Sequence, residues 1–126
     1  MKRMIPLLLS LLLLTGCGRN TSDSSYEQIT QEAAKEMMDA QEVIILDVRE
    51  QDEYDSGHIP GAVLLPVGTI DEDTAADVIP EKDSTVLVYC RSGNRSKTAS
   101  STLADLGYTD IYEFGGINTW PYDTEP

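Results

Sequence analysis

The 126-residue sequence is poor in histidine, cysteine and large aromatic side chains, with one histidine, two cysteines, one tryptophan and one phenylalanine. No His, Cys or carboxylate cluster has metal-ligand spacing, so we expect no metal site and no cofactor. Basic residues are also scarce, with 9 Lys and Arg against 22 Asp and Glu and a formal charge of −13. This acidic balance argues against nucleic acid as a partner and against attachment to anionic lipid through charge.

The sequence also lacks an apolar run long enough to span a membrane. Its most apolar stretch, Ile5 to Leu14, is interrupted by Pro6 and Ser10. Ten helical residues would extend ~15 Å, about half of the hydrocarbon core of a bilayer. Because Lys2 and Arg3 precede this stretch, it has the features of a secretory signal.

The signal ends in Leu14-Thr15-Gly16-Cys17, which resembles a bacterial lipobox. We therefore expect a lipoprotein signal peptide over residues 1–16 and a lipid, including palmitate, on Cys17. A flexible tether of Gly, Asn, Thr and Ser would follow over residues 17–26, and one domain would occupy residues 27–126. The acyl chains would anchor an exported protein to the extracytoplasmic face of the bacterial envelope. An ordinary cleaved signal is the alternative.

The second cysteine, Cys90, follows the apolar run Val86-Leu87-Val88-Tyr89 and precedes a polar loop and a helical pattern. This order predicts a buried strand, a tight loop and a helix N-terminus, a place where free amides favour an anion. The same field favours thiolate, so Cys90 is a candidate nucleophile with a lowered pKa. With Cys17 lipidated, Cys90 has no disulfide partner in the chain. The alternative is an inert core cysteine.

Strand and helix patterns alternate along the domain. This alternation predicts an α/β fold with a small parallel β-sheet flanked by helices and joined by right-handed crossovers. The predicted strands cover residues 43–46, 62–65, 86–89 and 111–114, and the predicted helices cover residues 31–40, 69–79 and 95–106.

Four motifs, in order and spacing, resemble the rhodanese-like sulfurtransferase domain in its single-domain form, and the resemblance covers about residues 27–122. The motifs are Leu46-Asp47-Val48-Arg49 with Glu53, Gly57-His58-Ile59-Pro60-Gly61-Ala62, Tyr89 to Ser96, and Gly115-Gly116 followed by Trp120. The resemblance implies that Cys90 forms a persulfide. Sulfane sulfur would move from thiosulfate or a persulfide donor to a thiophilic acceptor, such as a small thiol or a partner protein's thiol, and the protein would act as a monomer.

The loop after Cys90 is the expected substrate-binding element. Its amides would form an anion-binding nest, and its arginines would attract an anionic donor and the leaving sulfite. Gly93 and Asn94 suit the positive φ values that such a curl requires. The expected substrate-binding residues are Arg91, Ser92, Gly93, Asn94, Arg95 and Ser96.

Four polar residues outside the loop are expected to be scaffold near the site. We expect Arg49 to pair with Glu53 and to brace the loop. Asp47 should lie close to the rim of the pocket, because it sits at the carboxyl end of a strand. His58 should stabilise a turn by hydrogen bonding rather than act as a base for Cys90.

Three other functions remain open from the residues. A cysteine phosphatase or arsenate reductase also uses a thiolate in an amide-lined loop with an arginine. The loop here has four residues between Cys90 and Arg95, one fewer than is usual in those enzymes, and a narrower loop suits a sulfur atom better than a phosphate. A non-catalytic docking module is the second alternative. A redox role for Cys90 is the third, although the chain offers no resolving cysteine.

Overall fold

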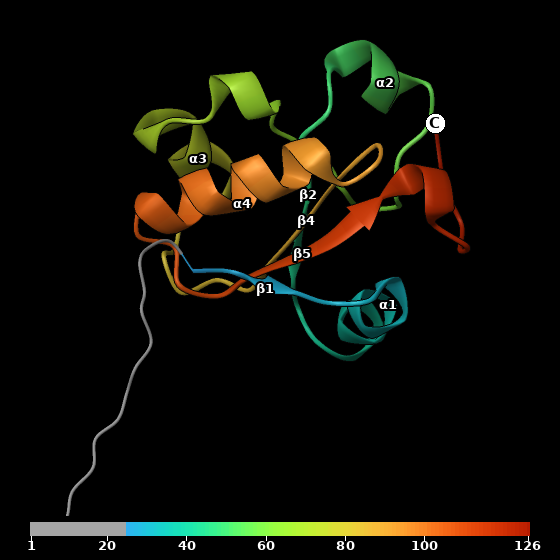
Figure 1. Cartoon of the computed structure of the whole chain (residues 1–126), viewed down its shortest axis with the longest axis horizontal. Coiled ribbons are helices and arrows are strands. Elements are labelled where there is room, and N and C mark those ends of the chain that lie inside the picture. Colours follow the sequence, from blue (N-terminus) through green and yellow to red (C-terminus); the bar gives the residue numbers. More distant parts are fainter. Residues whose placement is uncertain (1–24) are drawn as a thin grey trace, which may run out of the picture.

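A five-stranded parallel sheet with helices on both faces forms the domain, which confirms the predicted fold class (Figure 1). The computed structural model describes residues 25–126. The strand order is β1-β5-β4-β2-β3, and every pairing between neighbours is parallel. The strands are β1 (Glu27–Gln28), β2 (Ile44–Asp47), β3 (Val63–Leu64), β4 (Val86–Cys90) and β5 (Ile111–Gly116).

Helix α1 covers one face of the sheet, while α3 and α4 cover the other (Figure 1). Helix α2 lies beyond the carboxyl ends of the strands, close to the start of α4. The helices are α1 (Gln31–Ala40), α2 (Gln51–Asp55), α3 (Glu72–Val78) and α4 (Asn94–Asp105), with two 3-10 turns, η1 (Val67–Thr69) and η2 (Ile117–Thr119). No helix within residues 25–126 combines the length and the apolar character needed to cross a bilayer.

The predicted helix over residues 69–79 is wrong at its start. Residues 67–69 form η1, and α3 begins only after Asp71, whose carboxylate accepts a hydrogen bond from the Thr74 amide. A capping carboxylate satisfies the free amides of a first turn, and here it sets the boundary. Strand β5 runs to Gly116, two residues past its predicted end. The two-residue edge strand β1 has no sequence pattern long enough to predict it. The predicted signal peptide, the lipidation site Cys17 and residues 17–24 of the tether lie outside the described residues.

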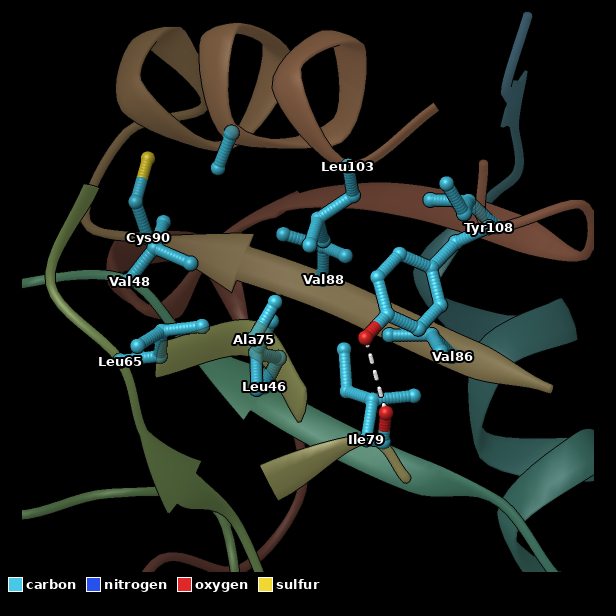
Figure 2. Packing of buried hydrophobic residues seen from close by; sticks show 12 residues of the cluster. Leu46, Val48, Leu65, Ala75, Ile79, Val86, Val88, Cys90, Leu103 and Tyr108 are labelled. Atoms are coloured by element: carbon cyan, nitrogen blue, oxygen red, sulfur yellow. Dashed lines mark hydrogen bonds between the residues drawn. The ribbon is translucent and has the colours of Figure 1, made fainter. Parts of the chain in front are cut away.

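Strand β4 is the centre of the core, and all five of its residues are buried. Val86, Val88 and Cys90 point toward α4, where they pack with Leu103 and other apolar side chains (Figure 2). Leu87 and Tyr89 face α1 and pack in the second apolar cluster. The alternation of a strand therefore places the Cys90 sulfur beneath the first turn of α4.

Ser100 is a point of local weakness on α4. It is fully buried, and its hydroxyl has no hydrogen-bond partner among residues 25–126. A buried unpaired hydroxyl costs about 1–3 kcal/mol, and alanine is the better helix former. We expect Ser100→Ala to raise the free energy of unfolding by about 1 kcal/mol in urea denaturation. Thr98→Ala, on the exposed side of the same helix, is the control for helix propensity alone. A loss of stability in Ser100→Ala, or a gain no larger than in Thr98→Ala, would contradict the prediction.

Candidate active site

The loop between β4 and α4 curls around the sulfur of Cys90. The amide of Gly93 lies 3.1 Å from Sγ and the amide of Ser96 lies 3.3 Å from it, and both donate to it. The Ser96 hydroxyl oxygen is 3.4 Å from the same sulfur. Gly93 has a φ of 109°, a left-handed value that favours glycine and that turns the chain into α4. Two amides of the predicted nest, those of Gly93 and Ser96, thus point at the sulfur.

The nest changes the acidity of Cys90. Burial raises the pKa of the thiol, but hydrogen bonds from the Ser96 hydroxyl and from the amides of Ser96, Gly93 and Ser92 outweigh burial, so the pKa lies below its ordinary value. A lowered pKa increases the thiolate fraction at neutral pH, and the thiolate is the nucleophilic form. The predicted direction of the Cys90 pKa shift agrees with this geometry.

The lowered pKa has a measurable consequence for alkylation. Because the pKa of Cys90 is lowered, the rate at which iodoacetamide alkylates folded Cys90 should begin to rise at a lower pH than the rate for Cys90 in urea-unfolded protein. Peptide-level mass spectrometry can follow Cys90 separately from Cys17 across a pH series. Burial of the thiol slows the absolute rate in the folded protein, so the two profiles are compared by the pH at which each begins to rise. An alkylation rate in the folded protein that first rises at or above the pH at which the unfolded profile rises would contradict the prediction.

The loop is held in place from the side of β5. The Asn118 amide donates to the Arg91 carbonyl oxygen at 3.1 Å. Gly116 pairs with Cys90 across an irregularity in the β4–β5 ladder. A Cβ built on Gly116 would lie 1.9 Å from the Arg91 carbonyl oxygen, so only glycine leaves room for the loop. The Gly115-Gly116 motif is thus the support on which the Cys90 loop rests.

The rest of the loop faces outward. Arg91, Ser92 and Asn94 are exposed. Arg91 forms no ion pair among residues 25–126, so its charge is available to an anion. The expectation of a positive φ at Asn94 is wrong, because Asn94 is the first residue of α4 and Gly93 alone makes the left-handed turn.

Glu53 pairs with Arg95 rather than with Arg49, which corrects the expected Arg49–Glu53 pair. The two carboxylate oxygens of Glu53 accept hydrogen bonds from the Arg95 guanidinium at 2.8 and 3.0 Å. This pairing lowers the pKa of Glu53 to about 2. The contact ties the first turn of α4 to α2, and it also neutralises much of the Arg95 charge beside the nest.

Arg49 instead pairs with Asp47 inside the domain. Asp47 is fully buried and Arg49 is 4% exposed, with Nη2 2.7 Å from the Asp47 carboxylate and 2.7 Å from the Gly57 carbonyl oxygen. The Tyr89 hydroxyl donates to the same carboxylate at 2.7 Å. The expectation that Asp47 lies at the pocket rim is therefore wrong. Although Asp47 ends a central strand, its carboxylate is buried and paired with Arg49.

His58 acts in a turn, as predicted from its motif. Its ring stacks on Tyr54 with centroids 3.8 Å apart, and Nδ1 lies 3.0 Å from the Tyr54 carbonyl oxygen. Its Nε2 lies 3.5 Å from the Glu125 carboxylate. All of these partners lie outside the Cys90 loop, so the contacts of His58 stabilise the turn and do not reach Cys90.

One polar residue at the site was missed from the sequence. Glu113 of β5 is buried, and its carboxylate accepts hydrogen bonds from the Ser96 hydroxyl and from the Gly115 amide. The sequence around Glu113 gives no indication that this glutamate is buried. Its place beside Ser96 follows only from the parallel pairing of β5 with β4. No group of three or more His, Cys, Asp or Glu side chains within residues 25–126 is arranged to hold a metal ion.

Comparison with known proteins assigns the chain to a family. The rhodanese-like domain family matches residues 30–121. The chain is 33% identical over 96 residues to GlpE of Coxiella burnetii, a thiosulfate sulfurtransferase, and the match covers 75% of this chain and 87% of GlpE. It is 36% identical over 112 residues to YrkF of Bacillus subtilis, which is described as a candidate sulfur carrier, and it spans 59% of the length of YrkF.

A solved structure has the same fold. A rhodanese from E. coli, determined with anions, superposes with a TM-score of 0.62 at 30% identity, over 67% of this chain and 98% of that one. Together with the family match over most of the described domain, this shows that the chain belongs to the rhodanese-like domain family, whose relatives include sulfurtransferases.

Proposed function

We propose that the protein is a sulfurtransferase that carries sulfane sulfur as a persulfide on Cys90. The observation that carries the proposal is the pair of loop amides, from Gly93 and Ser96, that donate to Sγ. Such amides stabilise a thiolate and then an anionic persulfide without reorganisation. The thiosulfate sulfurtransferase relative, at 33% identity, supports thiosulfate or a related sulfane-sulfur compound as the donor.

Two displacements make up the reaction. The Cys90 thiolate attacks the outer sulfur of thiosulfate, a new S–S bond forms, and the S–S bond of the donor breaks with its electron pair leaving on sulfite. An acceptor thiolate then attacks the outer sulfur of the Cys90 persulfide. That S–S bond breaks and its electron pair returns to Cys90 as thiolate. No oxidant is required, since sulfur leaves in the oxidation state in which it arrived.

The test is intact-mass analysis after incubation with thiosulfate, polysulfide or glutathione persulfide, followed by peptide mapping. We expect a gain of one sulfur on Cys90 that is absent in Cys90→Ala and is reversed by a thiol or by cyanide. The sulfur count on Cys17 serves as an internal comparison. The absence of any gain with all donors would reject the enzymatic proposal and would favour a docking module. Hydrolysis of a phosphate ester that is lost in Cys90→Ser would favour the phosphatase alternative.

Arg91 is the cation that we expect to attract the donor. It is exposed and forms no ion pair within residues 25–126, whereas Arg95 is bound to Glu53. A unit charge near a surface site contributes roughly 1 kcal/mol, so Arg91→Ala should lower kcat/KM for thiosulfate by about fivefold, mainly through KM. Lys35→Ala removes the same charge from α1 and should change little. Equal effects in the two variants would contradict the assignment, and added salt should reduce the difference between Arg91→Ala and wild type.

We also propose that the protein is exported and anchored to the envelope by lipid on Cys17, with the domain on the extracytoplasmic face. The support is the Lys2 and Arg3 charges, the apolar stretch and Leu14-Thr15-Gly16-Cys17. Metabolic labelling with a palmitate analogue should mark the wild type and leave Cys17→Ser unmarked. Labelling that persists in Cys17→Ser, or no label in the wild type, would reject the anchor.

A further inference from the structure

The buried carboxylate of Glu113 is linked to Cys90 by a continuous chain of hydrogen-bond contacts. Glu113 is 2% exposed. Its Oε2 accepts from the Ser96 hydroxyl at 2.5 Å and from the Gly115 amide at 3.0 Å. The Ser96 oxygen is 3.4 Å from the Cys90 sulfur. Ser96 of α4 therefore bridges Cys90 of β4 and Glu113 of β5. Figure 2 shows the Cys90 side chain on the face of the sheet that α4 covers.

The Glu113 carboxylate has no cationic partner within the described part of the chain. No Lys, Arg or His among residues 25–126 forms an ion pair with Glu113, and its other oxygen accepts from the neutral Gln28 amide at 3.1 Å. The ionisable residues of the elements packed around β5 point elsewhere. Glu27 on β1 and Lys97 and Asp105 on α4 are exposed, and Arg95 on α4 pairs with Glu53. Tyr89 on β4 and the charged residues of α1 lie on the opposite face of the sheet.

The Ser96 hydroxyl lies next to two possible anions, the Cys90 thiolate and the Glu113 carboxylate, but it has only one proton to donate. It cannot donate to the Cys90 thiolate and to an ionised Glu113 at the same time. When Glu113 is ionised, Ser96 donates to it and can only accept from the Cys90 S–H. When Glu113 carries a proton, Glu113 donates to Ser96. Ser96 can then donate to the thiolate, which as an anion is a stronger acceptor than the Gly93 carbonyl oxygen 3.0 Å from the same hydroxyl. The two proton placements use the same heavy-atom positions.

We propose that Glu113 is a positioning residue that acts through Ser96 and stores the proton of Cys90. The S–H proton moves to the Ser96 oxygen as the Ser96 proton moves to Glu113 Oε2. The products are the Cys90 thiolate, an intact Ser96 hydroxyl that donates to it, and a neutral Glu113 carboxyl. Both arrangements carry one negative charge and the same number of protons, so the transfer requires no other reactant. The proton returns to Cys90 when the acceptor has taken the sulfur.

The arrangement lowers the cost of making a buried nucleophile. Creating an isolated charge in a protein interior is expensive, whereas this transfer only moves a charge that the interior already holds. The role of this transfer in catalysis rests on the proposed sulfur transfer. The proton coupling itself is a property of the free protein and can be measured without any sulfur donor.

The test is the pH profile of Cys90 alkylation by iodoacetamide, followed by peptide-level mass spectrometry on the full chain. For coupled groups the charge of the pair, rather than of one residue, changes with pH. The wild type should therefore show two rises in the alkylation rate, separated by an intermediate plateau in which the rate does not change with pH, whereas one titrating thiol gives a single rise and a final plateau. In Glu113→Gln the rate should instead rise about tenfold per pH unit below a single pKa, as for one titrating thiol. Ser96→Ala should give the same steep profile, and the double variant should add nothing further.

Asp110→Asn is the matched control. This carboxylate also accepts from two hydroxyls, those of Thr85 and Tyr112, but it precedes β5 at the opposite end of the strand from Gly116. Asp110→Asn should keep the wild-type plateau. A single steep titration in the wild type would overturn the proposal, and so would a Glu113→Gln variant that reacts faster at low pH with an unchanged profile shape. Sulfur gain from thiosulfate is scored separately. An intermediate plateau without sulfur gain would reject the sulfurtransferase proposal alone, and sulfur gain without the intermediate plateau would reject the proton store alone.

Discussion

Gly116→Ala should slow persulfide formation at Cys90 by at least about 10²-fold even though no reacting atom is changed. The added Cβ would lie 1.9 Å from the Arg91 carbonyl oxygen, 2.3 Å from its carbonyl carbon and 2.6 Å from the Ser92 amide nitrogen. Real Cβ atoms essentially never approach other heavy atoms below 3.0 Å. These neighbours are backbone atoms, so no side chain can rotate away to relieve the clash. The strand and the loop must separate.

Separation would damage the nest directly. Arg91 and Ser92 start the curl that aims the amides of Gly93 and Ser96 at the sulfur. A misplacement of about 1 Å can cost about 10²-fold in rate, and overpacking of this kind typically costs about 1–3 kcal/mol of stability. We therefore expect the rate of sulfur gain from thiosulfate to fall by at least about 10²-fold, with a smaller relative loss in the free energy of unfolding.

Gly68→Ala is the matched control for Gly116→Ala. A Cβ on Gly68, in η1, meets no heavy atom within 4 Å, and its φ is not in the left-handed region. Its effect on stability should stay within about 0.5 kcal/mol, and sulfur transfer should be unchanged. The measurements are intact-mass kinetics of sulfur gain and urea denaturation on both variants. Sulfur gain at the wild-type rate in Gly116→Ala would contradict the account of the loop support.

The site divides into a part that the sequence predicts and a part that it does not. Cys90 and its amide nest follow from local order, since a strand, a tight loop and a helix start place free amides at the end of the strand. The Gly93 turn follows in the same way, because glycine is the residue that takes a positive φ without strain. These features depend on neighbours in the chain, so the sequence alone is enough to predict them.

The pairing of charges could not be predicted, because it depends on distances between segments. Glu53 is closer in sequence to Arg49 than to Arg95, yet α2 places it against the first turn of α4. Arg49 folds back on Asp47, two residues away, because both enter the interior at the end of β2. Glu113 meets Ser96 only because β5 lies beside β4 in the sheet. In each case the sequence offers several possible partners for the side chain, and the tertiary structure brings only one of them within contact distance.

Asp47→Asn should destabilise the domain more than any change of a surface charge. Arg49 is 4% exposed, and its guanidinium has the Asp47 carboxylate as its only ion-pair partner among residues 25–126. Removing one partner of a buried ion pair leaves an uncompensated charge, which typically costs about 3–5 kcal/mol. The Tyr89 hydroxyl would lose its charged acceptor as well. We expect a loss of about 3–5 kcal/mol in the free energy of unfolding by urea denaturation.

Two further variants separate the buried charge from other causes of that loss. Asp39→Asn changes a carboxylate that is 64% exposed and paired with Lys35, and an exposed pair of this kind should cost less than about 1 kcal/mol. Asp47→Asn combined with Arg49→Met removes the orphaned charge and should recover part of the stability, because a buried pair can be replaced by apolar side chains at little net cost. The Gly57 carbonyl oxygen would still lose its donor, so recovery should be incomplete. A double variant less stable than Asp47→Asn would show that Arg49 stabilises the domain through packing and through Gly57 rather than through the pairing of its charge.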